Sequence, residues 1–165
     1  MKNPIQRLSE LTTEHSLTVA VAESLTCGLL ASEIGKGENA SEWFCGAVVA
    51  YQTAVKEQVL GVTDGLDPCS AECASRLAQG VRSLLQADIA VATTGVGGPD
   101  SEDGHPPGTV FLGWADATGS GAELFHFGGE PEDVLRATVD RAMILLVGLA
   151  GGQGLADGGP STSPR

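Results

Sequence analysis

Positively charged side chains are scarce in this chain of 165 residues. Nine Lys and Arg stand against 21 Asp and Glu, which gives a formal net charge of −12. A chain this acidic lacks the attraction that draws proteins to nucleic acid or to an anionic membrane, so neither is expected as a partner. Long apolar runs are also missing, since the longest covers only residues 142–147, and residues 1–14 are largely polar. We therefore expect no membrane span and no signal peptide, and a soluble cytoplasmic protein.

Sequence signals for metals and common cofactors are missing as well. The three histidines, His15, His105 and His126, are isolated from one another, so a metal site is not expected. No GxxxxGK[S/T] phosphate loop occurs. The glycine-rich residues 95–100 fail as a dinucleotide fingerprint because Pro99 interrupts them and a loop follows. The four cysteines form no CxxC pair, which favours free thiols in a reducing compartment. The sequence predicts a protein that works without metal or cofactor.

The hydrophobic pattern predicts helices that alternate with strands. Helices are expected over residues 4–15, 25–34, 56–60, 70–85 and 131–149, and strands over 17–22, 47–51, 89–94, 109–114 and 123–127. The first strands are apolar throughout. The expected fold class is therefore α/β, with a sheet that is parallel at its centre, carries an added antiparallel hairpin and has helices on both faces. Residues 1–150 are expected to form one domain. Residues 151–165, rich in Gly, Ser and Pro, are expected to form a disordered tail.

Three loops leave the expected carboxyl ends of strands, at Ser24, at Tyr51 and at Thr94 and Gly95. Because ligands of such sheets bind beyond these ends, we expect the three loops to lie together.

Ser24 stands where a strand gives way to a helix, and two interpretations are open. Spacing alone favours a plain N-cap. The alternative is a nucleophile on a sharp turn, where the helix N-terminus and backbone N–H groups stabilise an oxyanion. No histidine is well placed as its base, so Lys56 is the candidate base, if it is not an ordinary solvated lysine. Three roles are open for Tyr51: it orients the serine hydroxyl, stacks on a ligand or caps the edge of the sheet. Two are open for Arg136: it binds a phosphate, or it is a solvent-exposed residue on the surface of its helix.

Several segments, in the correct order and spanning residues 8–149, resemble the CinA C-terminal domain family of competence/damage-inducible proteins. Ala22-Glu23-Ser24-Leu-Thr26-Cys-Gly28-Leu is similar to the family motif AESxTGGL, and Gly46-Ala-Val-Val-Ala-Tyr51-Gln-Thr-Ala-Val-Lys56 to GxVVAYSNxxK. Thr94-Gly-Val-Gly-Gly-Pro99 is similar to SGIAGPxGG, Pro106-Pro-Gly-Thr-Val110 to KPVGTV, and Val134-Leu-Arg136-Ala-Thr138 to VRxxT.

The resemblance implies a three-layer α/β/α domain with a mixed, mostly parallel sheet, acting as a homodimer on a small-molecule nucleotide without metal or cofactor. The implied reaction is hydrolysis of the carboxamide of nicotinamide mononucleotide (NMN) to nicotinate mononucleotide and ammonia, in pyridine nucleotide recycling. Ser24 would be the nucleophile, Lys56 its base and Tyr51 an assisting hydroxyl. The implied substrate-binding residues are Thr26, Gly28, Thr94, Gly95 and, for the phosphate, Arg136.

The sequence departs from the family motifs at several positions. Cys27 replaces a glycine, Gln52 and Thr53 replace Ser-Asn, Thr94 replaces a serine, and Pro131 stands where the family usually has an arginine. The change at Pro131 removes a cation near the implied phosphate site. The alternative to a hydrolase is therefore a non-catalytic nucleotide-binding or regulatory member of the same family.

Overall fold

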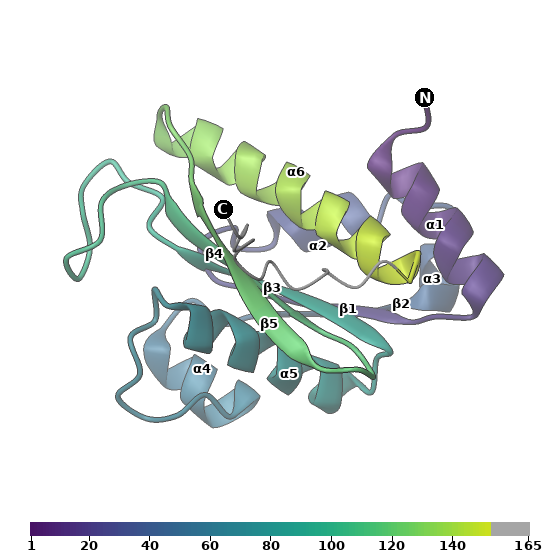
Figure 1. Ribbon diagram of the computed structural model, residues 1–165, viewed down its shortest axis with the longest axis horizontal. Coiled ribbons are helices and arrows are strands. Elements are labelled where there is room, and N and C mark those ends of the chain that lie inside the picture. The colour runs from purple at the N-terminus through teal and green to yellow at the C-terminus, as the bar shows by residue number, and fades with distance from the viewer. Residues whose placement is uncertain (153–165) are drawn as a thin grey trace, which may run out of the picture.

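In the computed structural model, which describes residues 1–152, helices and strands alternate along the chain as the hydrophobic pattern predicts (Figure 1). In chain order the elements are α1 (Pro4–His15), β1 (Val19–Glu23), α2 (Leu29–Ile34), α3 (Ala40–Trp43), β2 (Phe44–Val49), α4 (Thr53–Leu60), α5 (Ala71–Leu85), β3 (Ile89–Gly95), β4 (Thr109–Ala115), β5 (Ser120–His126) and α6 (Pro131–Ala150). From residue 153 onward, the expected tail lies outside the described residues. Within residues 1–152, no helix has the length and apolar character needed to cross a membrane.

The five strands form one mixed sheet in the order β2-β1-β3-β4-β5. β1 pairs in parallel with both β2 and β3, while β4 runs antiparallel to β3 and β5 antiparallel to β4. The expected α/β sheet, parallel at its centre with an antiparallel hairpin added, is therefore confirmed. Figure 1 shows the helices in two layers, with α1, α2, α3 and α6 on one side of the sheet and α4 and α5 on the other.

The two faces of the sheet differ in the size of their side chains. Val19 and Val21 of β1 and Val91 of β3 belong to the core shared with α1, α2, α3 and α6. The alternate positions are alanines, such as Ala20 and Ala92, and they face α4 and α5. Side chains of a strand point alternately to opposite faces, so the small residues form one continuous surface. This surface allows α5 to approach the sheet closely.

The second helix begins later than the sequence predicts, at Leu29 and not directly after Ser24. Residues 24–28 form turns, with hydrogen bonds from Cys27 N–H to the Ser24 carbonyl (3.1 Å) and from Leu29 N–H to the Thr26 carbonyl (2.9 Å). Cys27 and Gly28 both have positive φ, 46° and 97°, a conformation that a right-handed helix cannot include. The prediction that Ser24 caps this helix is therefore wrong, because Gly28 occupies the N-cap position. Ser70, in contrast, caps α5 as predicted and accepts from Cys73 N–H at 3.1 Å.

Gly113 is the point of closest approach between β4 and α5. A Cβ at this position would overlap the carbonyl oxygen of Ala74, which belongs to the backbone of α5 and has no room to move. We expect Gly113→Ala to lower the free energy of unfolding by at least about 1–3 kcal/mol, because overpacking forces the helix away from the sheet.

Urea denaturation of the purified variant measures this change. Gly128→Ala is the matched control, because a Cβ there meets no atom within 4 Å. Equal stability of the two variants would contradict the role assigned to the Gly113 contact.

Candidate active site

The three loops that were expected to meet do lie together, at the carboxyl edge of the parallel strands. The register places Glu23, the last residue of β1, beside Val49, the last residue of β2, and beside Thr93 of β3, which continues two residues further to Gly95. The segments that follow surround a cavity of about 310 Å³. Its lining residues are Ser24, Leu25, Tyr51, Thr53, Lys56, Pro68, Cys69, Thr94, Gly95, Val96, Gly97, Gly98, Glu102, Asp103, Pro131 and Leu135.

The turn that carries Ser24 is held by the buried carboxylate of Glu23, which is 1% exposed. Oε1 accepts from the Thr26 hydroxyl (2.6 Å) and from Leu30 N–H (2.8 Å), and Oε2 accepts from Ala31 N–H (3.0 Å). Three donors thus compensate for the loss of water around this carboxylate, and two of them are N–H groups in the first turn of α2. Glu23, and not Ser24, is the side chain that satisfies this end of the helix.

A chain of hydrogen bonds connects the Glu23 carboxylate to the Ser24 backbone, and the donor of each bond can be assigned. A carboxylate only accepts, so it takes the single hydroxyl hydrogen of Thr26. The 2.8 Å contact between the Thr26 and Thr93 hydroxyls must then have Thr93 as its donor. Thr93 in turn accepts from Ser24 N–H, through its carbonyl at 3.0 Å and its hydroxyl at 3.4 Å. Within residues 1–152 the Ser24 hydroxyl itself makes no hydrogen bond, so the turn is fixed while the hydroxyl faces the cavity.

Lys56, at the centre of α4, is only 3% exposed. Its Nζ donates to the Tyr51 carbonyl at 3.0 Å, and no carboxylate pairs with it in the described part of the chain, whereas the exposed Lys36 pairs with Glu33. Burial lowers the pKa of Lys56 from its ordinary value of 10.5, and the Cys73 thiol opposes this shift. An unpaired, desolvated amine of this kind is suited to accept a proton.

Cys69 also lines the cavity and is a second possible nucleophile. Burial, followed by the charge of Asp67, raises the pKa of its thiol to about 11. A thiol reacts as its thiolate, which is scarce at neutral pH when the pKa is this high. The geometry and the charge of the cavity therefore favour Ser24 over Cys69.

Of the residues that the resemblance implies for substrate binding, Thr94 and Gly95 line the cavity, and three others do not. Thr26 is fully buried beneath the cavity, where it binds Glu23, and Gly28 is the N-cap of α2. The Arg136 side chain is 70% exposed and lies 3.7 Å from Asp133 on the same helix. The structure thus does not bring Arg136 to the site, because the preceding residue of α6, Leu135, is the one that lines the cavity.

Two acidic lining residues, Glu102 and Asp103, lie in the loop expected after Pro99, for which the sequence pattern predicts no functional role. A signal for them existed. Since β3 ends at the carboxyl edge and β4 runs antiparallel to it, the connecting loop has to start and finish at that same edge. Cys27, the residue that departs from the family motif nearest to Ser24, is exposed and does not line the cavity.

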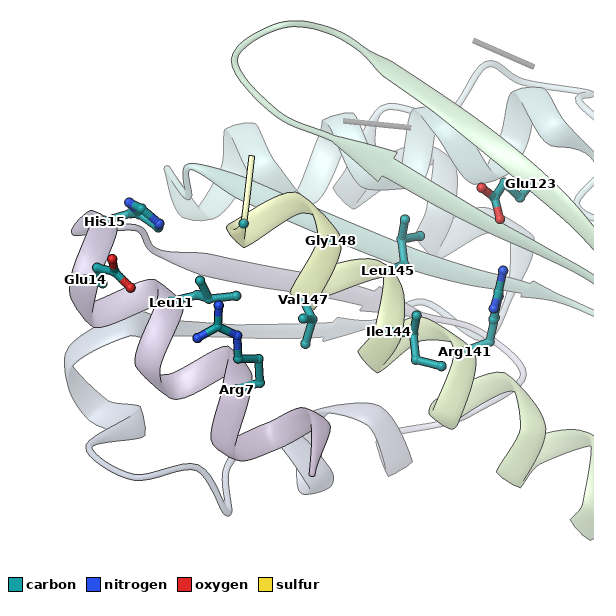
Figure 2. Close-up of a pocket in the computed structure, with 11 residues that line it drawn as sticks. Arg7, Leu11, Glu14, His15, Glu123, Arg141, Ile144, Leu145, Val147 and Gly148 are labelled. Carbon is teal, nitrogen blue, oxygen red and sulfur yellow. The ribbon is translucent and has the colours of Figure 1, made fainter. Parts of the chain in front are cut away.

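A larger cavity, of about 550 Å³, lies elsewhere, between α1 and α6 beside β5 (Figure 2). Arg7 and His15 of α1, Arg141 of α6 and Glu123 of β5 are among its lining residues. Arg141 stacks 5.1 Å from the ring centre of Phe125. None of the described residues that line this cavity is a serine, threonine, cysteine or lysine. Its described lining therefore offers no hydroxyl, thiol or amine that matches Ser24 and Lys56 of the smaller cavity.

Comparison with known proteins identifies the family. The family model described as CinA C-terminal domain matches residues 2–150, which include every residue that lines the smaller cavity. The chain belongs to the CinA C-terminal domain family.

Solved structures show the same CinA fold. A competence-damaged protein (CinA) superfamily protein from Escherichia coli superposes with a TM-score of 0.85 at 30% identity, and the match covers 88% of each chain. A competence/damage inducible protein from Agrobacterium tumefaciens gives a TM-score of 0.81 at 27% identity, covering 90% of this chain and 97% of that one.

Curated relatives are longer than this CinA domain. A Bacillus subtilis (strain 168) protein that carries a competence-damage inducible name is 41% identical over 129 residues, which are 76% of this chain and 31% of that protein. A similarly named protein of Geobacillus kaustophilus is 46% identical over 106 residues, or 62% of this chain and 26% of that protein. The chain thus spans about a third or less of the length of these relatives.

The Glu23 carboxylate can be tested by an isosteric substitution. Glu23→Gln keeps the shape but replaces one acceptor oxygen by an NH₂ group, so either Ala31 N–H or the donors at Oε1 lose their acceptor. Leaving a buried donor unsatisfied costs about 1–3 kcal/mol, and we expect this decrease in the free energy of unfolding. Urea denaturation measures it, and the control is Glu33→Gln on the exposed side of the same helix, where the expected change is below about 0.5 kcal/mol. A Glu23→Gln protein as stable as the control would exclude the proposed network.

Lys56 is predicted to reduce stability at neutral pH. The unfolded chain keeps the ordinary lysine pKa, so between the lowered pKa and 10.5 it binds more protons than the native state, and stability rises with pH across this interval. Lys56→Met has no amine to desolvate, so we expect it to be more stable than the parent at about pH 7, by a margin that narrows toward about pH 10. Urea denaturation at both pH values measures this difference in stability. The control is Lys36→Met, because Lys36 is exposed and paired with Glu33. A margin that is independent of pH would contradict the assignment.

Proposed function

We propose that this chain is a serine amidohydrolase that hydrolyses the carboxamide of a nicotinamide nucleoside or nucleotide, with Ser24 as nucleophile and Lys56 as base. One observation carries the proposal. A single cavity is lined by a serine whose hydroxyl is not engaged within residues 1–152 and by a buried lysine whose pKa is lowered. The resemblance to the CinA family supplies the candidate substrate, NMN, and a homodimer as the working form.

The first half of the reaction forms an acyl-enzyme. Ser24 Oγ attacks the carbonyl carbon of the carboxamide while Lys56 Nζ accepts the hydroxyl proton. The C–N bond then breaks, and Lys56 returns the proton to the leaving nitrogen, which departs as ammonia. The Tyr51 carbonyl, which accepts a hydrogen bond from Nζ at 3.0 Å, holds the amine in position for both transfers.

The second half of the reaction consumes one water molecule. Lys56 takes a proton from the water, which attacks the ester carbon, and the proton goes to Ser24 Oγ as the acyl–oxygen bond breaks. The net change is carboxamide plus water to carboxylic acid plus ammonia, which become carboxylate and ammonium near neutral pH.

The negative charge of the two tetrahedral intermediates requires nearby donors. The N–H groups of Leu25 and Thr26, directly after the nucleophile, have no acceptor within residues 1–152 and are the candidate donors. The Thr94 hydroxyl donates to the Pro68 carbonyl at 2.6 Å, so its role is to shape the cavity wall and not to bind the oxyanion.

Tyr51 has the position of a residue that contacts the ligand. Its side chain is 64% exposed at the cavity, while its backbone holds Lys56. In this proposal the ring stacks on the bound pyridine, and the hydroxyl is the assisting group that the family resemblance implies.

Release of ammonia from NMN or from its phosphate-free riboside by the purified protein tests the proposal. Ser24→Ala should abolish release, while its free energy of unfolding stays within about 0.5 kcal/mol, because the hydroxyl makes no hydrogen bond within residues 1–152. The parent rate should increase with pH through a limb below 10.5, where Lys56 loses its proton.

Lys56→Arg, which keeps the charge but cannot supply a neutral amine, and Lys56→Met, which is expected to be stable, should both be inactive. A Ser24→Ala protein with near-normal turnover would refute the assignment. If the unsubstituted protein binds the ligand but releases no ammonia, the result supports the alternative of a non-catalytic nucleotide-binding or regulatory protein.

A further inference from the structure

The charge around the Ser24 cavity is negative. Glu102 and Asp103 line it from the loop between β3 and β4, and both are exposed, with no hydrogen-bond or ion-pair partner for their side chains in the described part of the chain. Cys69, whose thiol pKa is raised mainly by burial and to a smaller extent by nearby carboxylates that include Glu102 and Asp103, lines the same cavity.

Cations to balance these carboxylates are scarce at the site. Lys56 is the single Lys or Arg among the described residues that line the cavity, and it is buried, with a lowered pKa. Arg136 points to solvent beside Asp133. Arg7 and Arg141 belong to the other cavity, between α1 and α6 (Figure 2). A phosphate group therefore finds no paired arginine or lysine here.

The N-terminus of α6 adds to the negative charge. Pro131, whose ring lines the cavity, has no N–H, and Glu130 N–H donates to Asp133 Oδ2 at 2.9 Å. Glu132 and Asp133 both lie in the first turn. A long helix normally offers its first N–H groups to an anion. In α6 the N–H group is absent at Pro131, and the N–H group of Glu130 is already bonded to the Asp133 carboxylate. Acidic side chains also surround this end of the helix.

On the basis of the proposed function, we propose that the natural substrate class is a phosphate-free, cationic pyridinium carboxamide of the nicotinamide riboside type, and that NMN is disfavoured. The pyridinium ring carries one positive charge, which Glu102 and Asp103 attract and which the Tyr51 ring can stack against. A phosphate monoester adds about −1.5 to −2 charges near pH 7, which the same carboxylates repel. The acidic loop thus selects by repelling the phosphorylated analogue as well as by attracting the cation.

The first experiment compares ammonia release from nicotinamide riboside and from NMN by the purified protein of 165 residues. We expect kcat/KM to be about tenfold or more higher for the riboside at low salt. Because exposed charges are screened beyond about 10 Å at 0.1 M salt, this preference should shrink at about 0.5 M salt. Faster hydrolysis of NMN would overturn the inference, implicate backbone N–H groups of residues 97–98 in binding phosphate, and leave the proposed function intact. Release of ammonia from neither compound would overturn the proposed function.

The second experiment removes the two lining charges. Glu102→Gln combined with Asp103→Asn should shift the preference toward NMN by about three- to tenfold, with KM for NMN falling. Asn tolerates the positive φ of 49° at position 103, so the loop should keep its conformation.

The matched control is Glu42→Gln combined with Asp140→Asn, which changes the net charge equally at exposed positions that do not line the cavity. It should leave the preference unchanged. An equal shift in both double variants would assign the effect to net charge and overturn the role of the loop. The absence of a shift in both variants would also overturn the role of the loop.

Discussion

The site depends on one buried charge, the carboxylate of Glu23 at the end of β1. A carboxylate removed from water destabilises the fold unless donors surround it, and here a threonine hydroxyl and two N–H groups of α2 do so. The same bonds orient Thr26 and Thr93, which hold the Ser24 backbone. The need to satisfy one acidic group therefore fixes a turn of five residues and leaves the serine hydroxyl free for chemistry.

The sheet supports this turn from the opposite face through small side chains. Alanines in β1 and β3 and Gly113 in β4 let the α5 backbone lie close to the strands. Close packing of α5 brings Cys69, just before that helix, against the edge where Ser24 lies. It also encloses Lys56, which has no carboxylate partner within residues 1–152. The fold thus tolerates an unfavourable buried amine at the position of the proposed base, and a conflict of this kind between stability and activity is common at active sites.

Membership of the CinA C-terminal domain family accounts for the scaffold but not for the ligand. Ser24 and Lys56, the proposed nucleophile and base, follow β1 and β2, whose order and register are set by the sheet. The charge at the cavity, in contrast, comes from the β3–β4 loop and the first turn of α6. Segments of this kind vary independently of the scaffold, because they contribute few contacts to the core. In this chain they carry carboxylates, and the charge of the ligand that the site accepts follows from them.

The sequence by itself determined the α/β class, the cap at Ser70 and the meeting of the loops at Ser24, Tyr51 and Thr94, because apolar periodicity and strand order are local signals. Only the tertiary structure decided the rest. The second helix begins only at Leu29, because Cys27 and Gly28 before it have positive φ angles. The side chain of Arg136 is exposed to solvent. The fold buries Lys56 and places Glu102 and Asp103 at the cavity. These outcomes depend on which neighbour each side chain meets across the sheet edge, and contacts between residues distant in sequence leave no periodic trace in it.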